Sequence, residues 1–334
     1  MNRLAKLLLV AIPFCGLLST ILLAQEATPI RAHVNLVNIS FVARDARGAL
    51  VDTLKQEDVE VLEDSVPQKI SVFAKSTDVP LTLGLIVDAS GSQEHFSKKH
   101  EKDLEVFLKR VLGPKDRVFL LCFGNHLRVV SDLTQSGSEV IERLKEYEKH
   151  TEHFPEIGPK EDRDLGTAFY DSIYYSVREK LRNEAGRRAL LVFSDGEDNS
   201  SSNDMMTTIE AAQAENVLVY TIRYTDPGKH GELTARNKYG IKVMDRIAKD
   251  TGGAHIDAKA LDPKQYFQQI ADELRTSYTL AYYPTNPMKD DIFRRIIVRP
   301  TPDGIKIRTK SGYLPEQPTT RSSLSKTQAT RGAD

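Results

Sequence analysis

An apolar run that ends abruptly at a carboxylate constrains the fold of this chain more than any other feature. Residues 81–87 are almost continuously hydrophobic and rich in branched side chains, as in a parallel strand covered on both faces. The run stops at Asp88, and Ser90 and Ser92 follow at alternate positions. Because open parallel sheets bind ligands at the carboxyl ends of their strands, these side chains predict a site there. Oxygen ligands alone suit a hard cation such as Mg²⁺.

Two later stretches add oxygen atoms to this predicted site. Residues 190–194 form a second apolar run, which ends at Asp195. Thr167 lies where residues 164–171 lead into a predicted helix. A carboxylate at the end of a buried strand is costly unless it is paired or binds a metal. Two such strand ends therefore favour a metal site over simple helix capping by Asp and Ser.

This pattern resembles the metal-ion-dependent adhesion site of the von Willebrand factor type A family, which reads Asp-x-Ser-x-Ser, then Thr, then Asp. The resemblance covers roughly residues 80–280. It implies that the hydroxyls coordinate the cation, that the aspartates act directly or through water, and that the two Asp-bearing strands are neighbours. Mg²⁺ is the expected cofactor, with Mn²⁺ and Ca²⁺ as alternatives. The five matching positions are Asp88, Ser90, Ser92, Thr167 and Asp195.

The fold class follows from the alternation of predicted strands and helices between residues 82 and 283. This alternation predicts a doubly wound, mostly parallel α/β sheet of the von Willebrand factor A or Rossmann-like kind. Residues 126–131 are predicted to return as an antiparallel edge strand. The predicted helices span residues 98–111, 138–149, 167–183, 203–214, 241–250 and 263–276, and the predicted strands after the first span residues 116–123, 188–194, 217–223 and 254–256.

Shorter strands flank the α/β region on both sides. Those before it predict a small β-rich accessory unit. Those after it, at residues 278–283, 293–298 and 305–307, either join that unit or extend the edge of the large sheet. The predicted domains are a signal peptide at 1–24, the β-rich unit at 30–76, the α/β domain at 80–283, a β-extension at 284–315 and a disordered tail at 316–334.

The N-terminus indicates export. Arg3 and Lys6 precede an apolar stretch that ends near Ala24, which is typical of a secretory signal and predicts a secreted or periplasmic protein. The alternative is an uncleaved membrane anchor, and only then is a membrane a partner. The formal net charge of -1 gives no reason to expect nucleic acid as a partner. Cleavage leaves Cys122 as the single cysteine, which we interpret as a buried apolar residue.

Other kinds of site fit the sequence less well. A nucleophilic serine lacks the Gly-x-Ser-x-Gly elbow, and neither His95 nor His255 has a diagnostic spacing as a base. At the end of the first apolar run, the Asp-x-Asp phosphatase pattern fails because Ser90 occupies its second position, and a P-loop fails because no Gly-Lys-Ser/Thr follows the strand. His150 and His153 have the spacing of zinc ligands but lack further ligands nearby, and the acidic run 195–199 lacks the features of an EF-hand.

The favoured hypothesis is a binding or adhesion module rather than an enzyme. Three neutral hydroxyls leave the cation's charge under-compensated, so a partner protein that presents an acidic residue would complete the site. Gln93, Glu94, Glu197 and a polar insertion at 226–239 are predicted to form its rim. The alternatives are a metal-dependent hydrolase or enzyme-complex subunit that uses the cation as a Lewis acid, and a purely structural cation.

Overall fold

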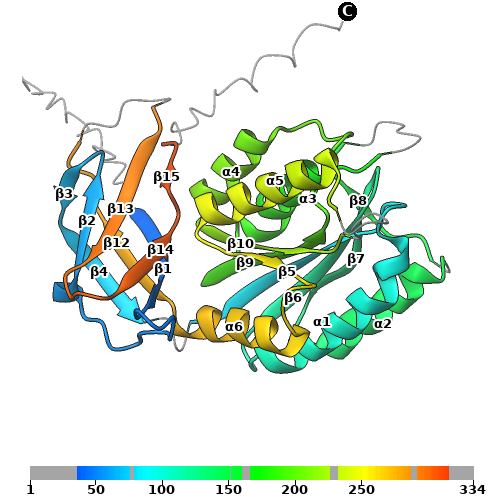
Figure 1. Ribbon diagram of the computed structural model, residues 1–334, viewed down its shortest axis with the longest axis horizontal. Coiled ribbons are helices and arrows are strands. Elements are labelled where there is room, and N and C mark those ends of the chain that lie inside the picture. Colours follow the sequence, from blue (N-terminus) through cyan, green and yellow to red (C-terminus); the bar gives the residue numbers. More distant parts are fainter. Residues whose placement is uncertain are drawn as a thin grey trace, which may run out of the picture. The chain divides into compact units, whose positions relative to one another are not determined.

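The computed structural model describes residues 36–75, 79–150, 152–159, 166–225, 232–286 and 292–315. These residues form one seven-stranded sheet with helices on both faces and two four-stranded antiparallel sheets (Figure 1). The predicted signal peptide and the predicted tail lie outside these ranges. No helix within them is both long enough and apolar enough to cross a membrane.

The large sheet has the strand order β11-β10-β9-β5-β6-β7-β8. Strands β11 to β6 are parallel, β7 is antiparallel to β6, and β8 is antiparallel to β7. All eight residues of β5 are buried, as the apolar run predicted. The prediction of a doubly wound, mostly parallel sheet is confirmed. The strands are β5 (Leu81–Asp88), β6 (Arg117–Phe123), β7 (Leu127–Thr134), β8 (Glu156–Ile157), β9 (Arg187–Ser194), β10 (Val217–Arg223) and β11 (His255–Asp257).

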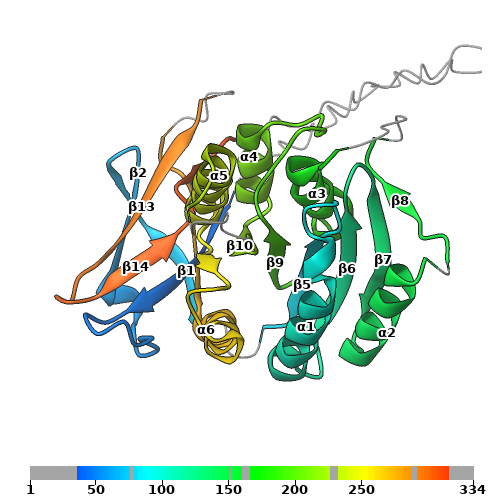
Figure 2. The same ribbon diagram turned by 45° about the vertical axis from the view of Figure 1, so that its right-hand side comes forward.

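Helices cover both faces of this sheet because each presents an apolar stripe to it. Side chains of α1, α2 and α6 share one buried cluster with the sheet, and side chains of α3, α4 and α5 share the other (Figure 2). A π-helical turn at Ser176–Leu181 continues α3. The helices are α1 (Ser97–Val111), α2 (Gly137–Glu148), α3 (Phe169–Tyr175), α4 (Met205–Ala214), α5 (Ala235–Thr251) and α6 (Pro263–Thr276).

Two local predictions were wrong. Helix α5 begins before residue 241, so residues 235–239 are helical and not part of a polar loop, while residues 226–231 lie outside the described ranges. The Thr234 hydroxyl accepts a hydrogen bond from the Asn237 N–H, and the Asn237 side chain accepts one from the Thr234 N–H, which fixes this earlier start. Strand β7 is also not an edge strand, because β8 pairs with its outer side.

The two antiparallel sheets, which we call the β-unit, enclose a third core. Their orders are β14-β1-β12-β4 and β15-β13-β2-β3. The C-terminal strands therefore pair with the N-terminal ones and do not extend the large sheet. Strand β12 pairs with β1 and β4, although its residues fall within the range 80–283. The strands are β1 (Val37–Arg44), β2 (Val59–Glu63), β3 (Val66–Gln68), β4 (Ile70–Lys75), β12 (Tyr278–Tyr282), β13 (Arg294–Pro300), β14 (Lys306–Thr309) and β15 (Gly312–Tyr313).

Glu273 on α6 connects the α/β layers with the β-unit. Its carboxylate accepts hydrogen bonds from Arg44 of β1 at 2.6 Å and from the Tyr220 hydroxyl of β10 at 2.9 Å. Arg308 of β14 donates to the same carboxylate. The Glu273 side chain is only 5% exposed, so these donors offset the cost of burying its charge.

We predict that Glu273→Ala lowers the free energy of unfolding by about 3–5 kcal/mol, because two guanidinium groups and one hydroxyl lose their shared acceptor. Urea denaturation followed by circular dichroism measures this change. Glu105→Ala is the control, since Glu105 forms only an exposed pair with Lys109 on α1. Equal denaturation midpoints for the two variants would show that Glu273 does not stabilise the junction.

Candidate metal centre

The two predicted carboxylate ligands lie at the carboxyl ends of adjacent strands. Strands β5 and β9 are paired in register from Leu81↔Arg187 to Val87↔Phe193, and Asp88 and Asp195 follow this paired stretch. The chain leaves β5 toward α1 on one face of the sheet and leaves β9 toward α4 on the other (Figure 1). Loops that diverge in this way open a crevice between the two strand ends, where doubly wound sheets bind ligands.

Asp195 gathers side chains from the loop that follows β5. Its Oδ2 atom accepts hydrogen bonds from the Ser92 hydroxyl at 3.0 Å and from the Gln93 amide at 3.0 Å. Its Oδ1 atom accepts one from the Glu197 N–H at 3.1 Å. The hydroxyls of Ser90 and Ser92 lie 3.3 Å apart. Since Ser92 is exposed and Asp195 is only 4% exposed, the hydroxyls lie between the carboxylate and solvent.

Asp88 is 1% exposed and is held from both sides. The Ser194 hydroxyl donates to its Oδ2 atom at 2.6 Å, and the Ser90 N–H donates to its Oδ1 atom at 3.0 Å. Burial, together with the negative charge of Asp195, raises the pKa of Asp88 to about 7, although the hydrogen bonds from Ser194 and Ser90 lower it. Two neighbouring carboxylates with so little compensating charge form a place that a cation would stabilise.

Thr167 reaches the same region through main-chain contacts. Its N–H donates to the Asn199 side chain at 2.7 Å, and the next N–H, of Ala168, donates to the Gly124 carbonyl at 2.7 Å. A methyl group at Gly124 would lie 3.9 Å from both the Ser90 Cα atom and the Gly166 carbonyl oxygen, so the Thr167 segment faces Ser90 across this glycine. Among the described contacts, none joins the Thr167 hydroxyl to the other four predicted ligands.

The donor set fits a hard divalent cation. All five predicted ligands offer oxygen, and four of them lie within one connected cluster of side chains and loop N–H groups. Across the described ranges, no group of three or more His, Cys, Asp and Glu side chains converges as a metal site.

Sequence reasoning did not identify three residues that form hydrogen bonds with the predicted ligands. Ser194 positions Asp88, Asn199 positions the Thr167 segment, and Gln93 bonds to Asp195 although it was predicted only as part of the rim. Ser194 and Gln93 each directly neighbour a predicted ligand in the sequence. That proximity is the only signal that a single sequence offers, because their partners come from other parts of the chain.

Glu197, which was predicted to lie at the rim, and its neighbour Asp198 have different roles. Glu197 forms an ion pair with Arg236 at 3.4 Å, beside the start of α5. Asp198 instead braces the loop, because it accepts the Tyr170 N–H at 3.1 Å and a hydrogen bond from the Ser201 hydroxyl. Burial raises the pKa values of both carboxyls.

The histidines considered for hydrolysis do not assemble with the serines. His255 lies on β11, with β10 and β9 between it and β5, and its Nδ1 atom is 2.9 Å from the Thr221 hydroxyl. His95 is exposed and lies in the turn that precedes α1. Cys122 is buried on β6, and burial raises the pKa of its thiol well above the usual range.

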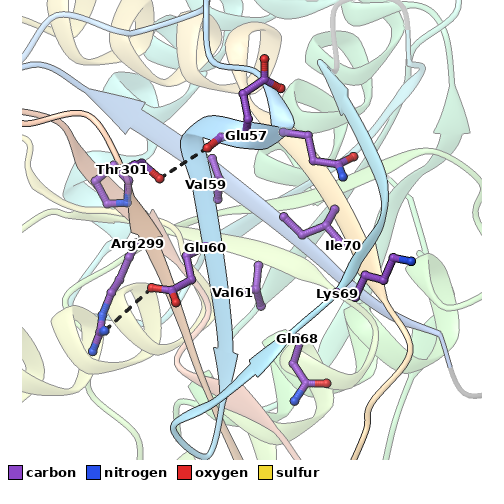
Figure 3. Close-up of a pocket in the computed structure, with 11 residues that line it drawn as sticks. Glu57, Val59, Glu60, Val61, Gln68, Lys69, Ile70, Arg299 and Thr301 are labelled. Carbon is purple, nitrogen blue, oxygen red and sulfur yellow. Dashed lines mark hydrogen bonds and ion pairs between the residues drawn. The ribbon is translucent and has the colours of Figure 1, made fainter.

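A pocket of about 870 Å³ lies in the β-unit, away from these ligands. Figure 3 shows Val59, Val61 and Ile70 on the strands around it, with Glu60 and Arg299 as an exposed ion pair at 3.9 Å. Strand β2 pairs with β3 only from Val61 to Glu63, so the two strands separate beside the pocket. None of the five predicted metal ligands lines it.

Comparison with solved structures shows similar folds at low identity. An aerotolerance-related membrane protein from Bacteroides fragilis is 15% identical, with 58% of this chain and 98% of that chain covered and a TM-score of 0.44. BatB from Bacteroides thetaiotaomicron is 18% identical, with coverages of 58% and 98% and a TM-score of 0.41. Proximal thread matrix protein 1 from the mussel byssus, solved with a zinc-occupied MIDAS motif, is 13% identical, with coverages of 62% and 48% and a TM-score of 0.45.

Comparison with curated proteins found no match. The model of the von Willebrand factor type A domain family matches residues 83–273, which is more than half of the chain and includes the strands that end at Asp88 and Asp195. This match agrees with the resemblance that the five-residue pattern indicated. The chain therefore belongs to the von Willebrand factor type A domain family.

Proposed function

We propose that this protein is an exported binding module that captures a partner protein through a divalent cation, held by Asp88, Ser90, Ser92, Thr167 and Asp195. The proposal depends most on one observation, the hydrogen-bonded oxygen cluster at the ends of β5 and β9. Domains of this family typically mediate protein interactions through such a site and are generally not enzymes. The proposed cation is Mg²⁺, with Mn²⁺ and Ca²⁺ as alternatives.

The chain's own residues determine what this site can recognise. Both carboxylates are buried, and each carboxylate oxygen already accepts a hydrogen bond from the protein. The other three predicted ligands are neutral hydroxyls, of which Ser92 is exposed, Ser90 half-buried and Thr167 buried, and neutral groups cannot cancel a divalent charge. A bound cation would therefore supply uncompensated positive charge at the surface. A carboxylate from a partner is the group that completes such a site with the largest electrostatic gain.

The surroundings of the site would select among acidic partners. Helix α5 begins beside Asp195, because a methyl group at Gly240 would lie 2.3 Å from the Asp195 carbonyl oxygen. The exposed side chains of Arg236, Lys238 and Tyr239 belong to this first part of the helix. Arg236 precedes Gly240 by about one helical turn and pairs with Glu197 at 3.4 Å, so this ion pair at the rim favours partners with polar or charged neighbours around their acidic residue.

We predict that Ser92→Ala and Thr167→Val each weaken Mg²⁺ binding at least about tenfold while the chain stays folded, because each change removes one ligand oxygen from a loop. Isothermal titration calorimetry measures the affinity, and thermal unfolding checks the fold. Ser71→Ala is the control, since Ser71 is an exposed serine of β4 in the β-unit. Unchanged affinity in both site variants would refute the ligand assignment.

We predict that the captured partner binds through one carboxylate. Purified protein would be used to capture partners from envelope extract, with and without chelator, and with the Ser92→Ala variant as a second bait. In the partner identified in this way, changing the critical Asp to Asn, or the critical Glu to Gln, should abolish binding as chelator does. The reason is that a neutral oxygen leaves the cation's charge uncompensated. If chelator abolishes binding but no partner carboxylate matters, the cation organises the loops and does not bridge the interface.

Export is the remaining part of the proposal and rests on the sequence of residues 1–24. We predict that the mature protein lacks this segment. Intact mass spectrometry of protein recovered from the envelope or the medium measures the N-terminus directly. A retained segment would instead support the membrane-anchored alternative.

A further inference from the structure

We infer that Gln93 is a positioning residue that keeps one oxygen of Asp195 from binding the cation directly. This inference rests on the proposed function, because it concerns the same site. A carboxylate oxygen held away from the cation would neutralise less of its positive charge. More of that charge would then remain to attract the carboxylate of the partner.

Gln93 joins three segments near the predicted ligands, namely the loop after β5, Asp195 after β9 and Tyr224 after β10. It follows Ser92 in the loop after β5 and is only 2% exposed. Its side-chain nitrogen donates to Asp195 Oδ2 at 3.0 Å and to the Tyr224 carbonyl oxygen at 3.2 Å. The β5 loop is thereby tied to the residues that follow β9 and β10. The contact to Asp195 is therefore a built feature of the interior and not a chance surface contact.

The orientation of the Gln93 amide follows from its neighbours. A carboxylate oxygen and a main-chain carbonyl oxygen both accept hydrogen bonds, so the nitrogen must face them. The amide oxygen is left buried with no hydrogen-bond partner among the described residues. An unpaired buried acceptor is costly. The free-energy cost of the unpaired amide oxygen is tolerated while both amide N–H groups are hydrogen-bonded. This pattern points to a specific role for the N–H that donates to Asp195.

The hydrogen bonds at Asp195 leave little room for direct coordination. A carboxylate oxygen has two lone pairs, and Oδ2 accepts from both Ser92 and Gln93. Ser92 donates its single hydrogen in this contact, so Ser90 is the donor in the 3.3 Å contact between the two hydroxyls, and Ser92 keeps one lone pair for a cation. The Gln93 donor occupies the second position on Oδ2. Asp195 Oδ2 would therefore act on a bound cation from a distance, whereas Oδ1, which accepts only the Glu197 N–H, keeps a lone pair.

Replacing this donor should convert Asp195 into a direct ligand. The test uses Gln93→Met in the full mature chain, because methionine has a similar length and fills space without a donor. Mn²⁺ alone is the probe. We expect Mn²⁺ to bind about tenfold more tightly by calorimetry, because a carboxylate oxygen in direct contact attracts the cation more strongly than one held at a distance. We also expect water-proton relaxation to report one fewer exchangeable water on the bound Mn²⁺, because Asp195 Oδ2 takes its place.

Gln213→Met is the matched control. Gln213, on α4, is also a buried glutamine, and its amide donates to the Asp250 carbonyl oxygen and the Ser311 hydroxyl, neither of which belongs to a predicted ligand. This control should lose stability with unchanged Mn²⁺ affinity and relaxation. Gln93→Leu repeats the test with a different side-chain shape if Gln93→Met does not fold.

The outcomes separate this inference from the proposed function. Wild-type protein that binds no Mn²⁺ overturns both. Wild-type binding together with equal or weaker binding in the Gln93 variants, and an unchanged number of exchangeable waters, overturns the role of Gln93 alone. Tighter binding with fewer exchangeable waters supports it, because a merely structural role for Gln93 predicts weaker binding and no loss of a water.

Discussion

The burial of two carboxylates at the ends of neighbouring strands is the constraint on which the rest of the site depends. Asp88 and Asp195 are almost fully covered, and the charge of Asp195 contributes to the raised pKa of Asp88. Each needs donors, and the surrounding loops supply them as hydroxyl, amide and main-chain N–H groups. Hydrogen bonds to the two carboxylates therefore fix the loop conformations. The same hydrogen bonds fix the positions of the Ser90 and Ser92 hydroxyls.

Sequence reasoning reached the fold class because burial on both faces leaves a direct trace, a continuous apolar run such as the one that ends at Asp88. It also placed the predicted ligands at strand ends that prove to be adjacent. Gln93 and Asn199 escaped it because their roles depend on partners from other parts of the chain. The early start of α5 escaped it for another reason, since the polar residues around Thr234 were interpreted as a loop although they form a reciprocal cap.

The β-unit shows the same limit at a larger scale. Strand β12 lies between β1 and β4, so the middle of one sheet comes from the end of the chain and its neighbours come from the beginning. Periodicity identifies such strands but cannot pair them across more than 200 residues. The pairing has a structural consequence: a chain cut just before β12 would remove a central strand from this sheet, and its main-chain hydrogen bonds to both neighbours would be lost.

A series of polar contacts, joined through helix α6, runs from the β-unit to Asp195. Glu273 fixes α6 to β1 and β14 through Arg44 and Arg308. About two turns earlier on the same helix, the Tyr266 hydroxyl lies 3.1 Å from the Tyr224 hydroxyl. The Tyr224 carbonyl oxygen accepts a hydrogen bond from the Gln93 amide, which also donates to Asp195. These links are part-buried or buried polar contacts, which are stronger than contacts in open solvent. The position of α6 and the hydrogen bonding of Asp195 are therefore linked through one connected set of groups that begins in the β-unit.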